Sequence, residues 1–227
     1  LDHISPFAIA ATLATEDKGY YTHPGFDPLA ILRAFWQNYQ SGETVSGAST
    51  ITQQLARGLL FSNEEQYQRT YMRKVREALL AAEITRRYSK EDILELYLNE
   101  IYYGNIAYGI EAAAQTYFQT SAEKLTLGQA AFLAGLPQAP AVYDIYSNRD
   151  VTLNRLRQVL VLVYQTSQEQ NCIYVNTSLQ PVCVDAASAA EAYNEVVGYT
   201  FQTPTVQMRY PHWVTYVRAQ LEDLFDA

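Results

Sequence analysis

Four ionisable residues lie close together near the N-terminus: Glu16, Asp17, His23 and Asp27. They follow an apolar segment, so the pattern places them on a loop that leaves a short apolar helix. A carboxyl group at the mouth of such a helix is partly desolvated, which raises its pKa and lets it exchange protons near neutral pH. The stretch therefore predicts general acid or base chemistry. The alternative is that Glu16 and Asp17 only accept hydrogen bonds from the loop backbone and that His23 is structural.

A second group of residues surrounds an expected helix start. It holds small, hydroxyl, amide and cationic side chains: Gly47, Ser49, Thr50, Gln53, Gln54 and Arg57. Backbone N–H groups at a helix start, together with the helix dipole, favour an anion. Gln53 and Arg57 are spaced to share one helix face. By itself the pattern is a weak signal for a phosphate site, and the alternative is an ordinary capped helix.

A third group is Arg73, Lys74 and Glu77 in an arginine-rich helical stretch. Their spacing puts two cations and a carboxylate on one face, either lining a cleft or forming solvated ion pairs. Carboxylates beside cations indicate acid–base work on an anionic leaving group, for which glycosyl transfer is the template. The three histidines (His3, His23 and His212) are far apart and no HExxH motif occurs, so no metal site is predicted.

Helical periodicity dominates the chain and predicts a mainly α class with one domain over residues 1–227. Ser/Thr-x-x-acid/amide pairs predict capping boxes at Thr50, Ser89 and Thr126. A brief hairpin is expected within 166–184. The expected helices span 6–15, 28–39, 49–61, 66–88, 89–101, 126–135, 148–164, 186–197 and 211–225.

Composition excludes several function classes. Sixteen Lys and Arg against 24 Asp and Glu give a net charge of −8, which argues against a nucleic-acid partner held by a basic surface. No apolar run approaches the roughly 20 residues that span a bilayer. The start of the chain has no initiator Met or basic leader, so we expect a piece of a longer protein. Cys172 and Cys183 form either a small loop disulfide or two unpaired thiols.

Five segments in this order resemble the motifs of the peptidoglycan glycosyltransferase domain, glycosyltransferase family 51, of class A penicillin-binding proteins. They are ATEDKGYYTHPGFD, GASTITQQLAR, RKVREALLA, YSKEDILELYLNEIYYGNIAYGIEAAAQTYF and LTLGQAAFLAGLPQAPAVY. The resemblance covers about residues 7–165. The ending RYPHWVTYVRAQLEDLF is similar to the stretch before the penicillin-binding half, so 208–227 is expected to begin a linker to an absent transpeptidase domain, in a protein that also carries a transmembrane helix.

The resemblance implies a lysozyme-like, two-lobe (head and jaw) glycosyltransferase fold. The jaw, about residues 28–61, would contact the membrane surface at the outer face of the bacterial cytoplasmic membrane. The implied enzyme polymerises lipid II into β-1,4 glycan strands for cell wall and cell shape, with inversion and release of polyprenyl pyrophosphate. The family is inhibited by moenomycin-type compounds, requires no cofactor, and allows a divalent cation (Mg²⁺ or Mn²⁺) to assist.

The resemblance also implies roles for individual residues. Glu16 matches the general base, and Glu77 matches a second essential acid near the leaving pyrophosphate. Contacts to the donor fall on Ser49, Thr50, Gln53 and Gln54, the cations that neutralise the pyrophosphate are Arg57, Arg73 and Lys74, and further substrate contacts are Asp17, His23 and Gly47. The Cys-bearing stretch 166–184 matches no motif, and a Cys172–Cys183 disulfide is sensible outside the cytoplasm.

Two alternatives remain at the level of sequence. A lysozyme-like lytic glycosidase would use Glu16 as a general acid to cleave the same glycan. It would act on an uncharged polymer, so it would have no need for the GASTITQQ and RKVRE segments. The other is a helical scaffold without catalysis, for which the only indication is Gly19, where the family often has Arg. The presence of both Glu16 and Glu77 argues against it.

Overall fold

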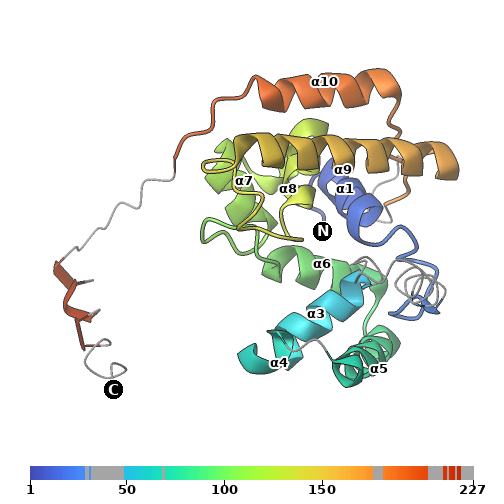
Figure 1. The fold of residues 1–227 in the computed structure, drawn as a ribbon. Coiled ribbons are helices and arrows are strands. Elements are labelled where there is room, and N and C mark those ends of the chain that lie inside the picture. Colours follow the sequence, from blue (N-terminus) through green and yellow to red (C-terminus); the bar gives the residue numbers. More distant parts are fainter. Residues whose placement is uncertain are drawn as a thin grey trace.

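The computed structural model describes residues 1–28, 31, 49–67, 70–175, 181–203, 212–213, 215–217 and 219–220. These parts are helical, with isolated β-bridges as their only extended pairing, which confirms the predicted mainly α class (Figure 1). The elements are α1 (Pro6–Glu16), α3 (Ile51–Leu60), α4 (Asn63–Tyr67), α5 (Tyr71–Arg87), α6 (Lys90–Glu100), α7 (Ile110–Phe118), η1 (Ala122–Lys124), α8 (Leu127–Gly135), α9 (Arg149–Gln170) and α10 (Ala186–Val197).

Helix α8 is the centre of the larger packing group. Every residue of it except Gln129 is buried, and it contacts α1, α7, α9 and α10. Gly128 allows the close approach of α10, since a Cβ there would lie 2.4 Å from the carbonyl oxygen of Ala192. In Figure 1, α10 lies over α9, and α1, α7 and α8 lie beneath them. The apolar core is therefore built between stacked helices.

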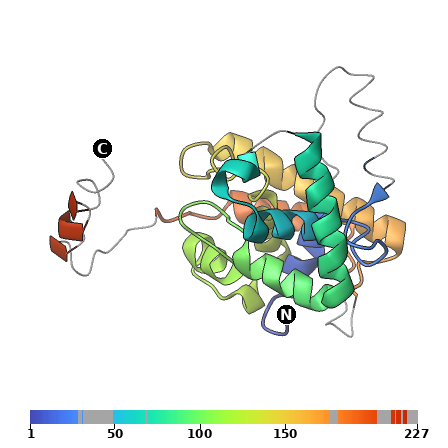
Figure 2. The same cartoon turned by 90° about the horizontal axis from the view of Figure 1, so that it is seen from below.

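Helices α3, α5 and α6 form the second packing group. Helix α3 packs against both α5 and α6, and Figure 2 shows α5 and α6 running at an angle to each other on the lower side of the molecule. Residues 29–30 and 32–48 of the predicted jaw lie outside the described residues, as does most of the helix expected over 28–39. The jaw assignment stays a prediction.

The predicted capping boxes set three of the helix starts. Thr50, Ser89 and Thr126 each accept a hydrogen bond from the backbone N–H three residues on, and Gln53, Asp92 and Gln129 return the contact. This reciprocal pairing satisfies N–H groups that lack partners inside the helix. All three boxes are confirmed, and α1 ends at Glu16, one residue beyond the prediction.

Several predicted element bounds are wrong. The single helix expected over 66–88 is two helices, α4 and α5. Thr70 is extended, and its side chain accepts a hydrogen bond from the backbone N–H of Arg73, which caps the start of α5. The helix expected over 148–164 continues to Gln170 and ends where Asn171 is left-handed. Helices α7 and η1 were not predicted. Within 166–175 and 181–184, the described part of the expected hairpin, one antiparallel bridge joins Ile173 and Val182. The described residues of the helix expected over 211–225 are helical, and the others lie outside the description.

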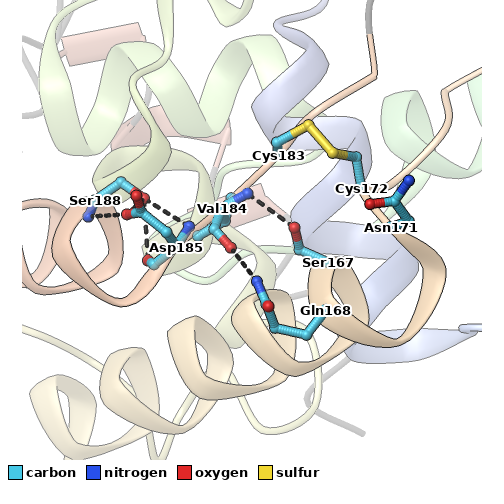
Figure 3. Close-up of a pocket in the computed structure, with 8 residues that line it drawn as sticks. All are labelled: Ser167, Gln168, Asn171, Cys172, Cys183, Val184, Asp185 and Ser188. Atoms are coloured by element: carbon cyan, nitrogen blue, oxygen red, sulfur yellow. Dashed lines mark hydrogen bonds between the residues drawn. A yellow bond between two sulfur atoms is a disulfide. The ribbon is translucent and has the colours of Figure 1, made fainter.

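The two cysteines are bonded to each other, which decides between the two alternatives left by the sequence. The disulfide joins the end of α9 to the segment before α10, where Val184 N donates to Ser167 Oγ and Gln168 Nε2 donates to Val184 O (Figure 3). An open pocket of about 300 Å³ lies beside the disulfide and includes none of the predicted site residues.

Within the parts of the chain that the structure describes, no helix combines the length and the apolar character that crossing a membrane requires.

Replacing both cysteines by serine should lower the free energy of unfolding by about 2–3 kcal/mol, because the bond closes a loop with a sequence separation of 11 residues and so restricts the unfolded chain. Denaturant unfolding of the oxidised protein and the double variant measures the difference. Wild-type protein unfolded in reductant is the control and should match the variant. A difference below about 0.5 kcal/mol would show that the bond adds little stability.

Candidate active site

The carboxylate of Asp17 joins the loop after α1 to the start of α3. Its Oδ1 accepts a hydrogen bond from His23 Nε2 at 2.8 Å, and its Oδ2 accepts from the backbone N–H of Ile51 at 3.1 Å. His23 Nδ1 accepts from Gly25 N at 3.2 Å, so the imidazole is neutral with its proton on Nε2. Asp17 and His23 are both buried and bound to each other, and their contact with substrate stays a prediction.

The rest of this loop is held from three helices. Gly25 has a positive φ of 97°, and a Cβ there would lie 2.3 Å from Ala81 O in α5. Thr50 Oγ1 donates to Gly25 O at 2.5 Å, and Lys90 Nζ in α6 donates to His23 O at 2.9 Å. The loop is therefore fixed against α3, α5 and α6, and only glycine fits at position 25.

Glu16 is the last residue of α1 and lies beside this loop. Its Oε2 accepts a hydrogen bond from Gln54 Nε2 at 2.6 Å. Burial raises the pKa of Glu16, and the Gln54 hydrogen bond and the positive charges of Arg155 and Arg57 oppose that rise. A partly buried carboxyl group with a raised pKa can exchange protons near neutral pH, as the sequence predicted.

Glu77 has a different environment from Glu16. Its side chain is 0% exposed, Arg73 Nη1 donates to Oε1, and Lys74 Nζ donates to Oε2 at 2.8 Å. Lys74 Nζ also donates to Ser49 Oγ at 2.7 Å, while its side chain remains 43% exposed. The spacing argument is confirmed, and the cluster presents positive charge over a buried carboxylate.

The start of α3 (residues 49–54) contacts Glu16 directly and the Glu77 cluster through Lys74. Ser49 contacts Lys74, Ile51 contacts Asp17, and Gln54 contacts Glu16. Gln53 is buried in the capping box, so its described contacts are structural. The structure thus places the predicted residues in separate hydrogen-bonded groups around the start of α3: Glu16 with Gln54, Asp17 with His23, Thr50 with Gln53, and Glu77 with Arg73, Lys74 and, through Lys74, Ser49. Arg57 is near enough to lower the pKa of Glu16, and Gly47 lies outside the described residues.

Sequence reasoning missed Arg155 of α9. Its Nε donates to Gly135 O at 3.2 Å, its guanidinium lies 5.5 Å from the centre of the Tyr143 ring, and its charge lowers the pKa of Glu16. The available signal was its spacing: Arg155 lies three residues after Thr152 and four before Val159, so it shares a helix face with these two buried residues of α9. A cation on a buried face needs partners, and here they are the Gly135 carbonyl, the Tyr143 ring and the charge of Glu16.

A resident metal ion does not fit the described residues. They contain no group of three or more His, Cys, Asp or Glu side chains that could hold one. Both oxygens of Glu77 already accept hydrogen bonds from cations. We therefore assign no chemical step to Mg²⁺ or Mn²⁺.

The chain is similar in sequence to known proteins. A family model described as "Transglycosylase" matches residues 1–164. Penicillin-binding protein 1A of Aquifex aeolicus is 49% identical over 160 residues (70% of this chain, 22% of that protein). Penicillin-binding protein 1A of Vibrio cholerae is 42% identical over 88% of this chain, and that of Escherichia coli is 47% identical over 69% of this chain. This chain spans 26% and 19% of those two proteins, so it corresponds to about a quarter or less of each relative. The crystal structure of Penicillin-Binding Protein 1A from Haemophilus influenzae aligns with a TM-score of 0.45, at 28% identity, over 62% of this chain and 18% of that chain.

Asp17→Asn should lower the free energy of unfolding by about 1–3 kcal/mol, because Asp17 accepts from two donors and an amide turns its NH₂ group toward one of them. Denaturant unfolding at pH 7 measures the loss. The matched control is Asp185→Asn at the exposed N-cap of α10, where Asp and Asn are equivalent and the change should be a few tenths of a kcal/mol. Equal stability of the two variants would contradict the bridging role of Asp17.

Proposed function

The chain belongs to the transglycosylase family, and from this we propose that it is a peptidoglycan glycosyltransferase that polymerises lipid II into β-1,4 glycan strands. The family match also confirms the resemblance predicted from the five sequence motifs. The observation that carries the proposal is the start of α3 (residues 49–54), which contacts both the carboxyl of Glu16, whose pKa is raised by burial, and the Lys74 cation beside Glu77. Glycosyl transfer from a lipid-linked pyrophosphate needs both.

Glu16 acts as the general base in the proposed reaction. The 4-hydroxyl of the acceptor sugar donates its proton to Glu16 Oε1, since Oε2 is engaged by Gln54. The hydroxyl oxygen then bonds to the anomeric carbon of the donor, and the bond from that carbon to the pyrophosphate oxygen breaks. The electron pair of that bond leaves with the polyprenyl pyrophosphate. Attack opposite to the leaving group inverts the anomeric carbon.

Arg73 and Lys74 receive the leaving group. Both are held on Glu77 before any substrate arrives, so positive charge is already in place where negative charge develops. Lys74 also reaches solvent, and Arg57 supplies further positive charge near Glu16. In this account Glu77 orients the cations and does not itself exchange a proton.

The lytic glycosidase is less favoured than glycosyl transfer. A glycosidase would use Glu16 as a general acid, and Arg73 and Lys74 would have no role in its reaction. The family match also names a transglycosylase.

The proposed substrate is lipid-linked, so the protein must meet a membrane. Exposed apolar side chains on α3 and α5, which pack against each other, support this: Leu59, Leu60, Met72, Val75 and Leu79. The last three share one face of α5 by their spacing. We propose that these side chains, with the predicted jaw, rest on the outer face of the cytoplasmic membrane, and that moenomycin-type inhibitors occupy the lipid II site. The full-length protein would add a transmembrane helix and a transpeptidase domain.

Glu16→Gln should reduce polymer formation by about 10²-fold or more, because the base is lost while the shape of the side chain is kept. Labelled lipid II in detergent, with products separated by size and digested by muramidase, measures turnover, and fluorescent moenomycin measures binding, which should persist. Glu100→Gln on the exposed surface of α6 is the matched control and should polymerise normally.

Turnover of Glu16→Gln within about threefold of wild type would remove Glu16 from the role of base. Cleavage of preformed glycan without any polymer would favour the lytic alternative.

Met72→Ser/Leu79→Ser should weaken binding to phosphatidylglycerol-containing vesicles by about tenfold or more, since each apolar side chain loses about 1.5–3 kcal/mol of transfer free energy. Co-sedimentation with vesicles measures it. Val151→Ser/Val161→Ser, which changes two exposed valines of α9, is the control and should bind normally. Equal loss in both variants would show that α5 is not a membrane-facing helix.

A further inference from the structure

Tyr97 of α6 places a polar group in the buried interior behind Glu16. The residue is 1% exposed, and its hydroxyl lies 3.2 Å from Gln54 Oε1. The Nε2 of the same amide is 2.6 Å from Glu16 Oε2. Tyr97, Gln54 and Glu16 therefore form one chain of hydrogen bonds that reaches the candidate base from the protein interior.

The donor and acceptor roles along these hydrogen bonds follow from the Glu16 carboxylate at one end. An ionised carboxylate can only accept hydrogen bonds, so the NH₂ end of Gln54 must face Glu16 and the carbonyl end must face Tyr97. Tyr97 is then the donor. If the amide reversed, the Tyr97 hydroxyl would accept from the NH₂ group, and its own proton would lose its acceptor in a buried setting. Among the described residues, Gln54 Oε1 is the acceptor within hydrogen-bond distance of that hydroxyl.

We propose that Tyr97 is a positioning residue for the proposed reaction: by donating to Gln54 it fixes which end of the amide faces Glu16, and so holds the base in its proton-accepting form with Oε1 turned to substrate. The inference rests on the proposed function of Glu16. Tyr97 touches neither base nor substrate in this account and acts only through Gln54.

The remaining charges around Glu16 do not depend on Tyr97. Asp17 follows it in the chain, Arg57 extends from α3 and Arg155 from α9, and all three influence the pKa of Glu16. Tyr103, which lies just after α6, also interacts electrostatically with Glu16. A change at Tyr97 that leaves the fold intact therefore alters the orientation of Gln54 and not the set of charges.

Tyr97→Phe tests the proposal by removing one hydroxyl. With no donor on its carbonyl, Gln54 can reverse and accept a proton from the acid form of Glu16, so that form gains stability. The pKa of Glu16 should therefore rise. Because activity requires the deprotonated form, Tyr97→Phe should lose its activity at a higher pH than wild type does when the pH is lowered. The acidic limb of kcat/KM for lipid II polymerisation should move up by about half to one pH unit. At pH values well above the limb, kcat should return to within about twofold of wild type.

Tyr117→Phe is the matched control. Tyr117 is equally buried, and its hydroxyl donates to Tyr103 O and accepts from Asn105, away from Gln54. This variant should lose stability and keep the wild-type limb. If Tyr97→Phe behaves in the same way, the role of Tyr97 is structural and the proposal is overturned.

A double-mutant cycle tests the route through Gln54. Gln54→Met removes the amide at similar length, and in that background Tyr97→Phe should cause no further shift of the limb. An undiminished shift would show that Tyr97 acts on Glu16 by another path and would overturn the proposal.

Carbon-13 NMR titration of the glutamate carboxyls, without substrate, separates this inference from the proposed function. The Glu16 resonance is identified as the one missing in Glu16→Gln, and its midpoint should rise in Tyr97→Phe and not in Tyr117→Phe. An unmoved midpoint overturns the positioning role even if polymerisation depends on Glu16. A raised midpoint in a protein that makes no polymer would leave the positioning of Glu16 standing and would count against the proposed reaction.

Discussion

The carboxylate of Asp17 accepts the first backbone N–H of α3, and the site is arranged around that contact. The first N–H groups of a helix have no partner within it, so a buried helix start needs acceptors from elsewhere. Thr50 supplies one from α3 itself, and Asp17 supplies another from the loop after α1. Because Glu16 precedes Asp17 and Ser49 precedes Thr50, satisfying this helix start also positions the proposed base, Glu16, on one side and the contact to Lys74 on the other.

The two carboxylates are suited to different tasks by their surroundings. Burial raises the pKa of Glu16, and a single amide donor engages one of its oxygens. Glu77 is buried between Arg73 and Lys74, so it holds charge in place. Removing one member of a buried ion pair leaves an uncompensated charge, which makes this cluster sensitive to substitution. In the proposed reaction Glu16 accepts a proton and Glu77 holds the cations that receive an anion, and these two roles together suit transfer from a pyrophosphate carrier.

Features that depend on a few neighbouring residues could be predicted from the sequence. The capping box at Thr50 and the shared face of Arg73, Lys74 and Glu77 follow from spacing alone, and the structure confirms both. Contacts between distant segments could not be predicted. The approach of Arg155 to Glu16 and the hydrogen bond between Gln54 and Glu16 depend on how α9 and α3 are placed relative to α1, which periodicity does not encode. The break between α4 and α5 was missed because helix propensity outweighed the capping signal of a single threonine, Thr70.

The central claim is that the start of α3 unites a base and a cation cluster into one site for a lipid-linked sugar. A crystal structure of the protein with a non-hydrolysable lipid II analogue tests it most directly. The account predicts a sugar hydroxyl within hydrogen-bond distance of Glu16 Oε1 and a phosphate oxygen in contact with Arg73 or Lys74 in the same complex. A ligand bound away from α3, for example in the pocket beside the disulfide, or bound with its phosphates far from these cations, would contradict it.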